Sequence, residues 1–146
     1  FEATSRSLEC LFSLLQDKGV NIKGTILKPN MVTAGSDSPV KADIEEVANQ
    51  TIKCLKMHVP DDLPGVTFLS GGQSDLDSTA HLDAMNKIGG FAWKLSFSYG
   101  RALQQPALKA WMGKNENTSL AQEALSHRAQ MNSLASEGSW NSSLEN

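Results

Sequence analysis

Three short segments with strand-like composition constrain the fold of this chain more than any other feature. They span residues 24–28, 66–70 and 94–99, carry β-branched and aromatic residues, and each runs directly into a proline or a glycine. A helical pattern lies in each gap between them. Because strands that are joined through a helix run parallel, the sequence predicts a parallel α/β sheet.

Helical periodicity covers most of the remaining chain. Leu8, Leu11, Phe12 and Leu15 recur at spacings of three and four residues, which places them on one helical face. The same reasoning predicts helices over residues 3–18, 39–57, 75–87, 105–111 and 116–134. Residues 33–38, rich in glycine and serine, are predicted to form a loop.

The number of strands limits the architecture. Three strands leave two sheet edges with unpaired backbone groups. A complete (β/α)8 barrel needs about 250 residues, whereas this chain has 146. The sequence therefore predicts a piece of a parallel α/β sheet or about the C-terminal half of a (β/α)8 TIM barrel.

Charge and hydropathy argue against two classes of partner. Lys and Arg number 13 and Asp and Glu 16, so the formal net charge is −3. The basic side chains are dispersed, and no nucleic-acid partner is expected, while a local basic pocket stays compatible with this balance. No run approaches the roughly 20 apolar residues of a membrane span, and residues 1–4 do not resemble the start of a signal peptide.

The cysteines and histidines form no metal-binding pattern. Cys10 and Cys54 lie outside any CxxC motif and are predicted to be small buried thiols in a reducing compartment. His58, His81 and His127 are widely separated, and surface or capping roles are expected for them. No metal site is predicted.

Unusual residues stand at the carboxyl ends of the predicted strands. Lys28 ends the first strand, Ser70-Gly71-Gly72 follow the second, and Ser98-Tyr99-Gly100-Arg101 close the third. In parallel α/β folds, these ends line the active site. Glycine turns that lead into helices present N–H groups to an anion, and Arg101 adds a charged fork suited to phosphate. The pattern predicts a divided phosphate site.

Lys28 supports two interpretations. At the inner end of a barrel strand it would be desolvated, and a neutral amine can attack a ketone to form a Schiff base that serves as an electron sink for C–C cleavage. Alternatively, Lys28 is a strand-end lysine whose ammonium group extends into solvent.

Three motifs in order resemble one known family, class I fructose-bisphosphate aldolase. The segment GTILKPNMVT (residues 24–33) resembles its Schiff-base segment, and FLSGGQS (68–74) and SFSYGRALQ (96–104) resemble its two following strand ends. The segments LKAW (108–111) and RAQMNSLA (128–135) resemble its closing helices. The agreement covers about residues 20–138.

This resemblance implies a fold, a reaction and a set of site residues. The fold would be a (β/α)8 barrel in which this chain supplies strands six, seven and eight, with residues 1–138 as the C-terminal part of one domain and 139–146 as a short polar tail. The reaction would be the reversible cleavage of fructose 1,6-bisphosphate to dihydroxyacetone phosphate and glyceraldehyde 3-phosphate, without metal or cofactor. Lys28 would form the imine. The implied phosphate-binding positions are Ser70, Gly71 and Gly72 for one phosphate, and Ser98, Gly100 and Arg101 beside it.

The resemblance also implies what the chain does not carry. The family's acid/base Asp and Glu residues and its other active-site lysines lie on earlier strands, so the segment alone is expected to be inactive. Family members commonly end in a tyrosine-bearing tail, whereas this chain ends in SSLEN (142–146). Pro106 replaces a small residue and is expected at a helix start, where proline is tolerated. The full-length form would be a cytoplasmic homo-tetramer, or a plastid protein in a photosynthetic source.

Three alternatives remain open on the sequence. The first is another lysine-dependent aldolase of similar barrel type, which would differ in the number of phosphates bound. The second is a non-catalytic phosphosugar-binding or scaffolding fragment. The third is a remnant that does not fold alone, because its outer strands have exposed edges.

Overall fold

The computed structural model describes residues 1–146 and contains a parallel three-stranded sheet in the order β1–β2–β3. The strands are β1 (Ile26–Leu27), β2 (Gly65–Phe68) and β3 (Lys94–Phe97). Ile26 pairs with Gly65 in the first ladder, and Val66 pairs with Leu95 in the second. The predicted parallel α/β sheet is confirmed, with each strand shorter than its predicted segment.

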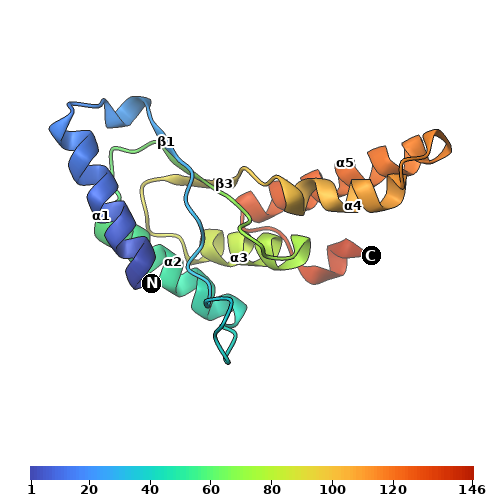
Figure 1. Cartoon of the computed structure of the whole chain (residues 1–146), viewed down its shortest axis with the longest axis horizontal. Helices are drawn as coiled ribbons and strands as arrows, with labels where there is room; N and C mark the ends of the chain where they lie inside the picture. The colour runs from blue at the N-terminus through green and yellow to red at the C-terminus, as the bar shows by residue number, and fades with distance from the viewer.

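Besides the sheet, the chain forms five α-helices (Figure 1). They are α1 (Glu2–Asp17), α2 (Ile44–His58), α3 (Asp75–Ile88), α4 (Arg101–Trp111) and α5 (Thr118–Ser136), with single 3₁₀ turns at Ile22–Gly24, Asn115–Asn117 and Ser142–Glu145. In Figure 1, α2 and α3 lie along one side of the sheet, while α4 and α5 run side by side and extend away from it, at the end opposite α1. Every predicted helix is present.

Two helices begin four or five residues away from their predicted starts. Helix α2 begins at Ile44, because the Asp43 carboxylate accepts a hydrogen bond from the Glu46 N–H at 2.8 Å and fixes the N-terminus there. Helix α4 begins at Arg101, so Pro106 lies inside the helix and the prediction that it stands at a helix start is wrong. Because proline has no N–H, the intrahelical hydrogen bond from residue 106 to the Ala102 carbonyl is missing in the second turn of α4.

The first strand also begins later than predicted. Gly24 closes a 3₁₀ turn, Ile22–Gly24, in which Asn21 accepts from the Lys23 N–H at 3.2 Å. This local hydrogen bond competes with strand pairing, so β1 begins only at Ile26.

One face of the sheet carries the core. Val66 and Phe68 on β2 are fully buried, and Leu27 and Leu95 flank them on the neighbouring strands. Helices α2 and α3 cover this face with Val47, Ile52, Leu55, Leu82 and Met85. On the opposite face Ile26 is 56% exposed. The sheet therefore has one covered face and one face that is open in this chain.

The two cysteines differ in their environment. Cys54 on α2 is buried, but Cys10 on α1 is exposed, so the prediction of two buried thiols is wrong for Cys10. Leu8 and Phe12 face the core from α1. Cys10 lies two residues from each of them, which places it on the far side of a helix with 3.6 residues per turn.

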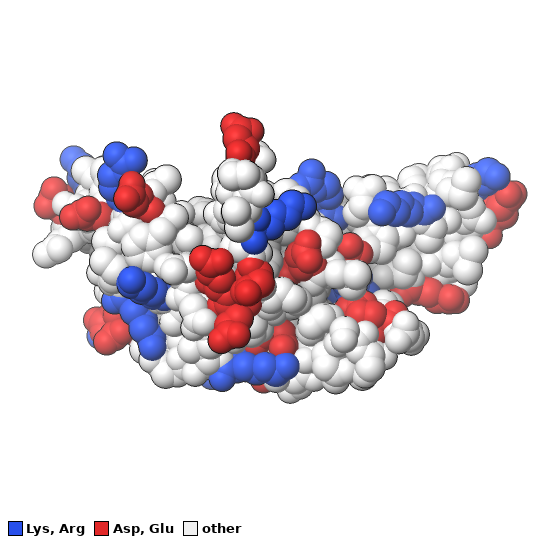
Figure 2. All heavy atoms as spheres, turned by 90° about the horizontal axis from the view of Figure 1, so that it is seen from below, with Lys and Arg blue, Asp and Glu red and all other residues white.

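The predicted polar tail, residues 139–146, packs against the helices. The Trp140 N–H donates to Asp83 Oδ1 on α3 at 3.0 Å, and the Arg128 guanidinium on α5 donates to the Glu145 carboxylate. No helix combines the length and hydropathy needed to span a membrane. The face shown in Figure 2 carries a group of acidic side chains near its middle, with basic side chains distributed around it.

Candidate functional site

The carboxyl ends of the three strands meet at one edge of the sheet. Parallel pairing continues past the strands, because the Leu69 N–H donates to the Pro29 carbonyl at 3.1 Å and the Ser98 N–H donates to the Phe68 carbonyl at 2.9 Å. The segments that begin at Lys28, Ser70 and Ser98 therefore leave the sheet side by side. The predicted site residues lie along this edge.

A tight turn follows β2, and we call residues 70–73 the Ser70 turn. The Gln73 N–H donates to the Ser70 carbonyl at 3.0 Å, and Ser70 itself is buried. Gly71 and Gly72 have φ of +56° and +100°, values that side chains other than glycine rarely adopt. A Cβ on Gly71 would also lie 3.0 Å from the Leu69 side chain. Helix α3 starts directly after the turn, where Ser74 accepts from the Asp77 N–H at 3.0 Å.

The Arg101 side chain reaches from the second glycine turn to the first. Gly100 is the N-cap of α4 and has no side chain to cap the helix, and the Leu103 N–H donates to the Gly100 carbonyl at 3.2 Å. The N–H groups of Arg101 and Ala102 are therefore the ones left without an intrahelical partner. The next residue, Arg101, is exposed, and its Nη2 lies 3.6 Å from the position that a Cβ on Gly72 would occupy. The structure therefore brings Gly72 and Arg101 together, as a divided anion site requires.

Tyr99 fixes the segment that precedes Arg101. Its hydroxyl donates to the Ser78 carbonyl on α3 at 2.8 Å, and burial raises the pKa of this phenol. The end of β3 is thus attached to the helix that follows the Ser70 turn. Ser98, at the start of this segment, is half-buried and keeps its N–H in the sheet.

Lys28 lies at the same edge, on the open face of the sheet. The register of β1 places it level with Thr67, which in turn pairs with Ser96 on β3. Lys28 is exposed in this chain, so the desolvation expected for it is not found here. The physical reason is the open face, on which Ile26 is exposed as well.

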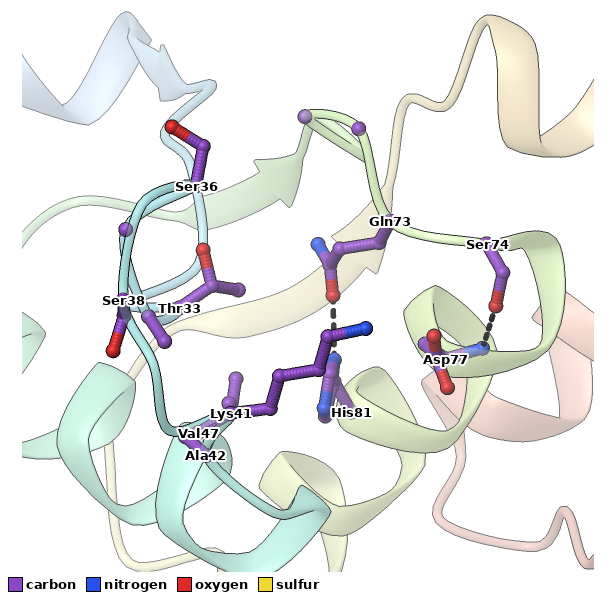
Figure 3. Close-up of a pocket in the computed structure, with 14 residues that line it drawn as sticks. Thr33, Ser36, Ser38, Lys41, Ala42, Val47, Gln73, Ser74, Asp77 and His81 are labelled. Carbon is purple, nitrogen blue, oxygen red and sulfur yellow. Dashed lines mark hydrogen bonds between the residues drawn. The ribbon is translucent and has the colours of Figure 1, made fainter.

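A pair that sequence reasoning missed, half-buried Gln73 and buried His81, supports the Ser70 turn. The Gln73 side chain donates from Nε2 to the Ser70 carbonyl at 2.9 Å, and its Oε1 lies 2.5 Å from His81 Nδ1 (Figure 3). His81 is only 7% exposed, so the expected surface or capping role is wrong for this residue. Burial lowers the pKa of His81, and the Asp77 carboxylate opposes this in part. The sequence feature that could have indicated this burial is the position of His81 between the apolar residues Ala80 and Leu82, two helical turns after the Ser74 cap.

An open hollow of about 780 Å³ adjoins the Ser70 turn on the side of the loop before α2. Thr33, Ser36, Ser38 and Lys41 line it from that loop, opposite Gly71, Gly72 and His81. In Figure 3 the Lys41 side chain extends across the hollow toward His81. Nowhere in the chain do three or more His, Cys, Asp or Glu residues lie close enough to hold a metal ion.

Comparisons with known proteins agree on one family. The family model described as "Glycolytic: Fructose-bisphosphate aldolase class-I" matches residues 1–146. A Xylella fastidiosa protein named "Probable fructose-bisphosphate aldolase class 1" is 50% identical over 96% of this chain, and fructose-bisphosphate aldolase 1 of Toxoplasma gondii is 51% identical over 95%. The chain spans only 42% and 38% of the lengths of these two relatives.

A solved structure agrees in three dimensions. Fructose-bisphosphate aldolase from Plasmodium falciparum, in a crystal complex with TRAP and a small-molecule inhibitor, superposes with a TM-score of 0.92 at 46% identity. The alignment covers 95% of this chain and 40% of that one.

Proposed function

Since this chain belongs to the class I fructose-bisphosphate aldolase family, we propose that it forms strands six, seven and eight of a (β/α)8 barrel and carries the Schiff-base lysine and the phosphate-binding turns. The contact between Arg101 and Gly72 carries this proposal. It joins two glycine turns, one helix N-terminus and one permanent positive charge at the carboxyl edge of a parallel sheet. That combination suits a phosphorylated sugar.

The proposed reaction is the reversible cleavage of fructose 1,6-bisphosphate. The Lys28 Nζ attacks the ketone carbon, the carbonyl oxygen leaves as water, and an imine results. Once protonated, the imine accepts the electron pair of the C–C bond that breaks, while the hydroxyl on the departing carbon loses its proton and glyceraldehyde 3-phosphate leaves. Protonation and hydrolysis of the resulting enamine release dihydroxyacetone phosphate and restore Lys28. This step needs a neutral, desolvated amine, so in the proposed complete barrel the remaining strands cover the open face on which Lys28 lies.

The two turns would divide the phosphate groups of the sugar between them. Ser70, Gly71 and Gly72 supply a hydroxyl and backbone N–H groups to one phosphate. Ser98, Gly100 and Arg101 supply a hydroxyl, the N-terminus of α4 and a guanidinium beside it. The support is the left-handed conformation of Gly71 and Gly72 and the uncapped start of α4.

The chain alone is proposed to be inactive. Proton transfer contributes about 10²–10⁴-fold to such reactions, and by family resemblance its agents lie on strands outside this segment. The full-length form is proposed to be a cytoplasmic homo-tetramer. One rival function has support from the structure: a non-catalytic phosphosugar-binding fragment, which the exposure of Lys28 favours.

Reductive trapping tests the lysine. The proposed complete barrel, in which the face that carries Lys28 is covered, is incubated with dihydroxyacetone phosphate and borohydride, and peptide mass analysis locates the adduct. We expect it on Lys28, and we expect Lys28→Arg to abolish it. Lys94→Arg is the matched control, because Lys94 is exposed on the same face at the opposite end of the sheet.

The same sample must be shown to be folded by slow amide exchange in β2. If a folded sample gives no Lys28 adduct, the non-catalytic fragment replaces the enzyme. Turnover of fructose 1,6-bisphosphate by the isolated chain near that of an intact homologue would contradict the proposed inactivity.

A further inference from the structure

The Ser70 turn is closed twice by the same residue. Both the backbone N–H and the side-chain Nε2 of Gln73 donate to the Ser70 carbonyl, at 3.0 and 2.9 Å. The backbone bond alone defines a four-residue turn. The side-chain bond adds a second restraint on the same carbonyl, and Gly71 and Gly72 lie between the two bonded residues.

The direction of these hydrogen bonds determines which ring nitrogen of His81 carries the hydrogen. Gln73 Nε2 faces two acceptors, the Ser70 carbonyl at 2.9 Å and the Met31 sulfur at 3.5 Å, so it must be the NH₂ end of the amide. Gln73 Oε1, which only accepts, therefore faces His81 Nδ1. His81 must carry a hydrogen on Nδ1, and in its neutral form Nε2 carries none.

We propose that His81 is a positioning residue for the Ser70 turn. Its Nδ1–H holds the Gln73 amide in the one orientation in which Nε2 donates to the Ser70 carbonyl. The opposite orientation would place an oxygen against both that carbonyl and the Met31 sulfur, and an NH₂ group against Nδ1–H. Through Gln73, His81 thereby fixes where the Gly71 and Gly72 N–H groups point, next to Arg101.

Both ends of this link are buried. His81 is 7% exposed and Ser70 is 6% exposed, while Gln73 between them is half-buried, so access of water to the connecting bonds is reduced. His81 is thus placed to act on a phosphate without touching it. The inference rests on the proposed phosphate-binding role of the Ser70 turn.

Two matched variants distinguish the effect of losing the hydrogen-bond donor of His81 from the effect of changing its side-chain volume. His81→Asn keeps an N–H donor at the δ position, whereas His81→Leu places a methyl group there. Gln73→Met keeps the length of Gln73 and removes its hydrogen bonds while His81 stays in the core. Inorganic phosphate and dihydroxyacetone phosphate are titrated into each protein, and the NMR shifts of the Gly71 and Gly72 amides report binding.

We expect His81→Leu and Gln73→Met to weaken phosphate binding about five- to tenfold, as loss of one hydrogen bond would do, and His81→Asn to restore it to within about twofold. Equal affinity in all four proteins overturns the inference, as does a His81→Asn protein as weak as His81→Leu. If the wild-type chain binds no phosphate at the Ser70 turn, the proposed function fails instead.

A second readout needs neither variants nor phosphate. The ¹⁵N spectrum of the neutral His81 ring in the wild-type chain is expected to show the hydrogen on Nδ1. A hydrogen on Nε2 overturns the inference whatever the binding data show, because Nδ1 could then not donate to Gln73.

Discussion

The guanidinium group of Arg101 lies against the backbone of Gly72, with Nη2 3.6 Å from the point where a Cβ would stand. These residues come from different strand-to-helix connections, and their contact joins the two turns that we propose bind phosphate. Both partners are exposed, so the contact is maintained by the buried elements beneath it, including the Tyr99 hydroxyl bonded to α3. Substitutions at this contact test the proposed site most directly.

Gly72→Ala tests the backbone of the Ser70 turn. A methyl group would fit in space, since 3.6 Å is an ordinary contact, but a φ of +100° is strained for alanine. We expect a loss of about 1–3 kcal/mol in the free energy of unfolding, or a reshaped turn that no longer binds phosphate. Denaturant unfolding and phosphate titration measure these outcomes.

Gly35→Ala is the control for this substitution, because Gly35 has no atom within 4 Å of the added methyl group and no positive φ. It should change stability by less than about 0.5 kcal/mol. Equal effects of Gly72→Ala and Gly35→Ala would show that the Ser70 turn is not constrained as described.

Arg101→Lys separates fork geometry from charge. The guanidinium can present two parallel N–H groups to a phosphate, while an ammonium acts as a single point charge. We expect phosphate affinity to fall about tenfold in Arg101→Lys, which corresponds to one charge-assisted hydrogen bond. Lys109→Arg, in the last turn of the same helix, is the control and should leave the affinity unchanged. A wild-type affinity in Arg101→Lys would contradict the assigned role.

The docked C-terminal segment should open in acid. Burial alone raises the pKa of Glu145, but hydrogen bonds from Arg128, Trp140 and His127 and the charge of Arg128 outweigh it and hold this pKa below its usual value. A carboxyl with a depressed folded-state pKa stabilises fully above its unfolded pKa, and the stabilisation is lost as the pH falls through the folded value. We therefore expect amide exchange of residues 139–146 to accelerate below about pH 4 beyond the intrinsic rate.

Glu145→Gln should remove that pH dependence and lower the opening free energy of the segment by about 1–3 kcal/mol at neutral pH. Glu116→Gln is the matched control, since the Glu116–Lys114 pair is exposed on both sides at 4.0 Å and should contribute less than about 1 kcal/mol. A pH profile that is the same in wild type and Glu145→Gln would refute the assignment.

The thiols should react at very different rates. Cys10 is exposed on α1, whereas Cys54 is fully buried and burial raises the pKa of its thiol. An aqueous disulfide reagent should therefore modify one thiol in the folded chain and the second only after denaturation. In Cys10→Ser no fast reaction should remain. A fast reaction in that variant would mean that α2 opens readily.

Periodicity and composition predicted the parallel sheet and all five helices, because these signals depend on neighbours within a few residues. They failed where a local hydrogen bond competed, as at Asp43, which moves the start of α2, and at Asn21, which shortens β1. Pro106 lies inside α4 and not at a helix start, because the helix begins four residues before its predicted start, directly after Gly100.

The strand-end motifs determined which residues are candidates for the site, since Ser70-Gly71-Gly72 and Gly100-Arg101 carry their chemistry in their residue types. Only the tertiary structure decided which of them meet. Gly72 and Arg101 come into contact because parallel strands end at one edge, and His81 reaches Gln73 because α3 folds back beneath the Ser70 turn. The exposure of Lys28 was likewise decided by the sheet, whose open face no pattern of residues within this chain can cover.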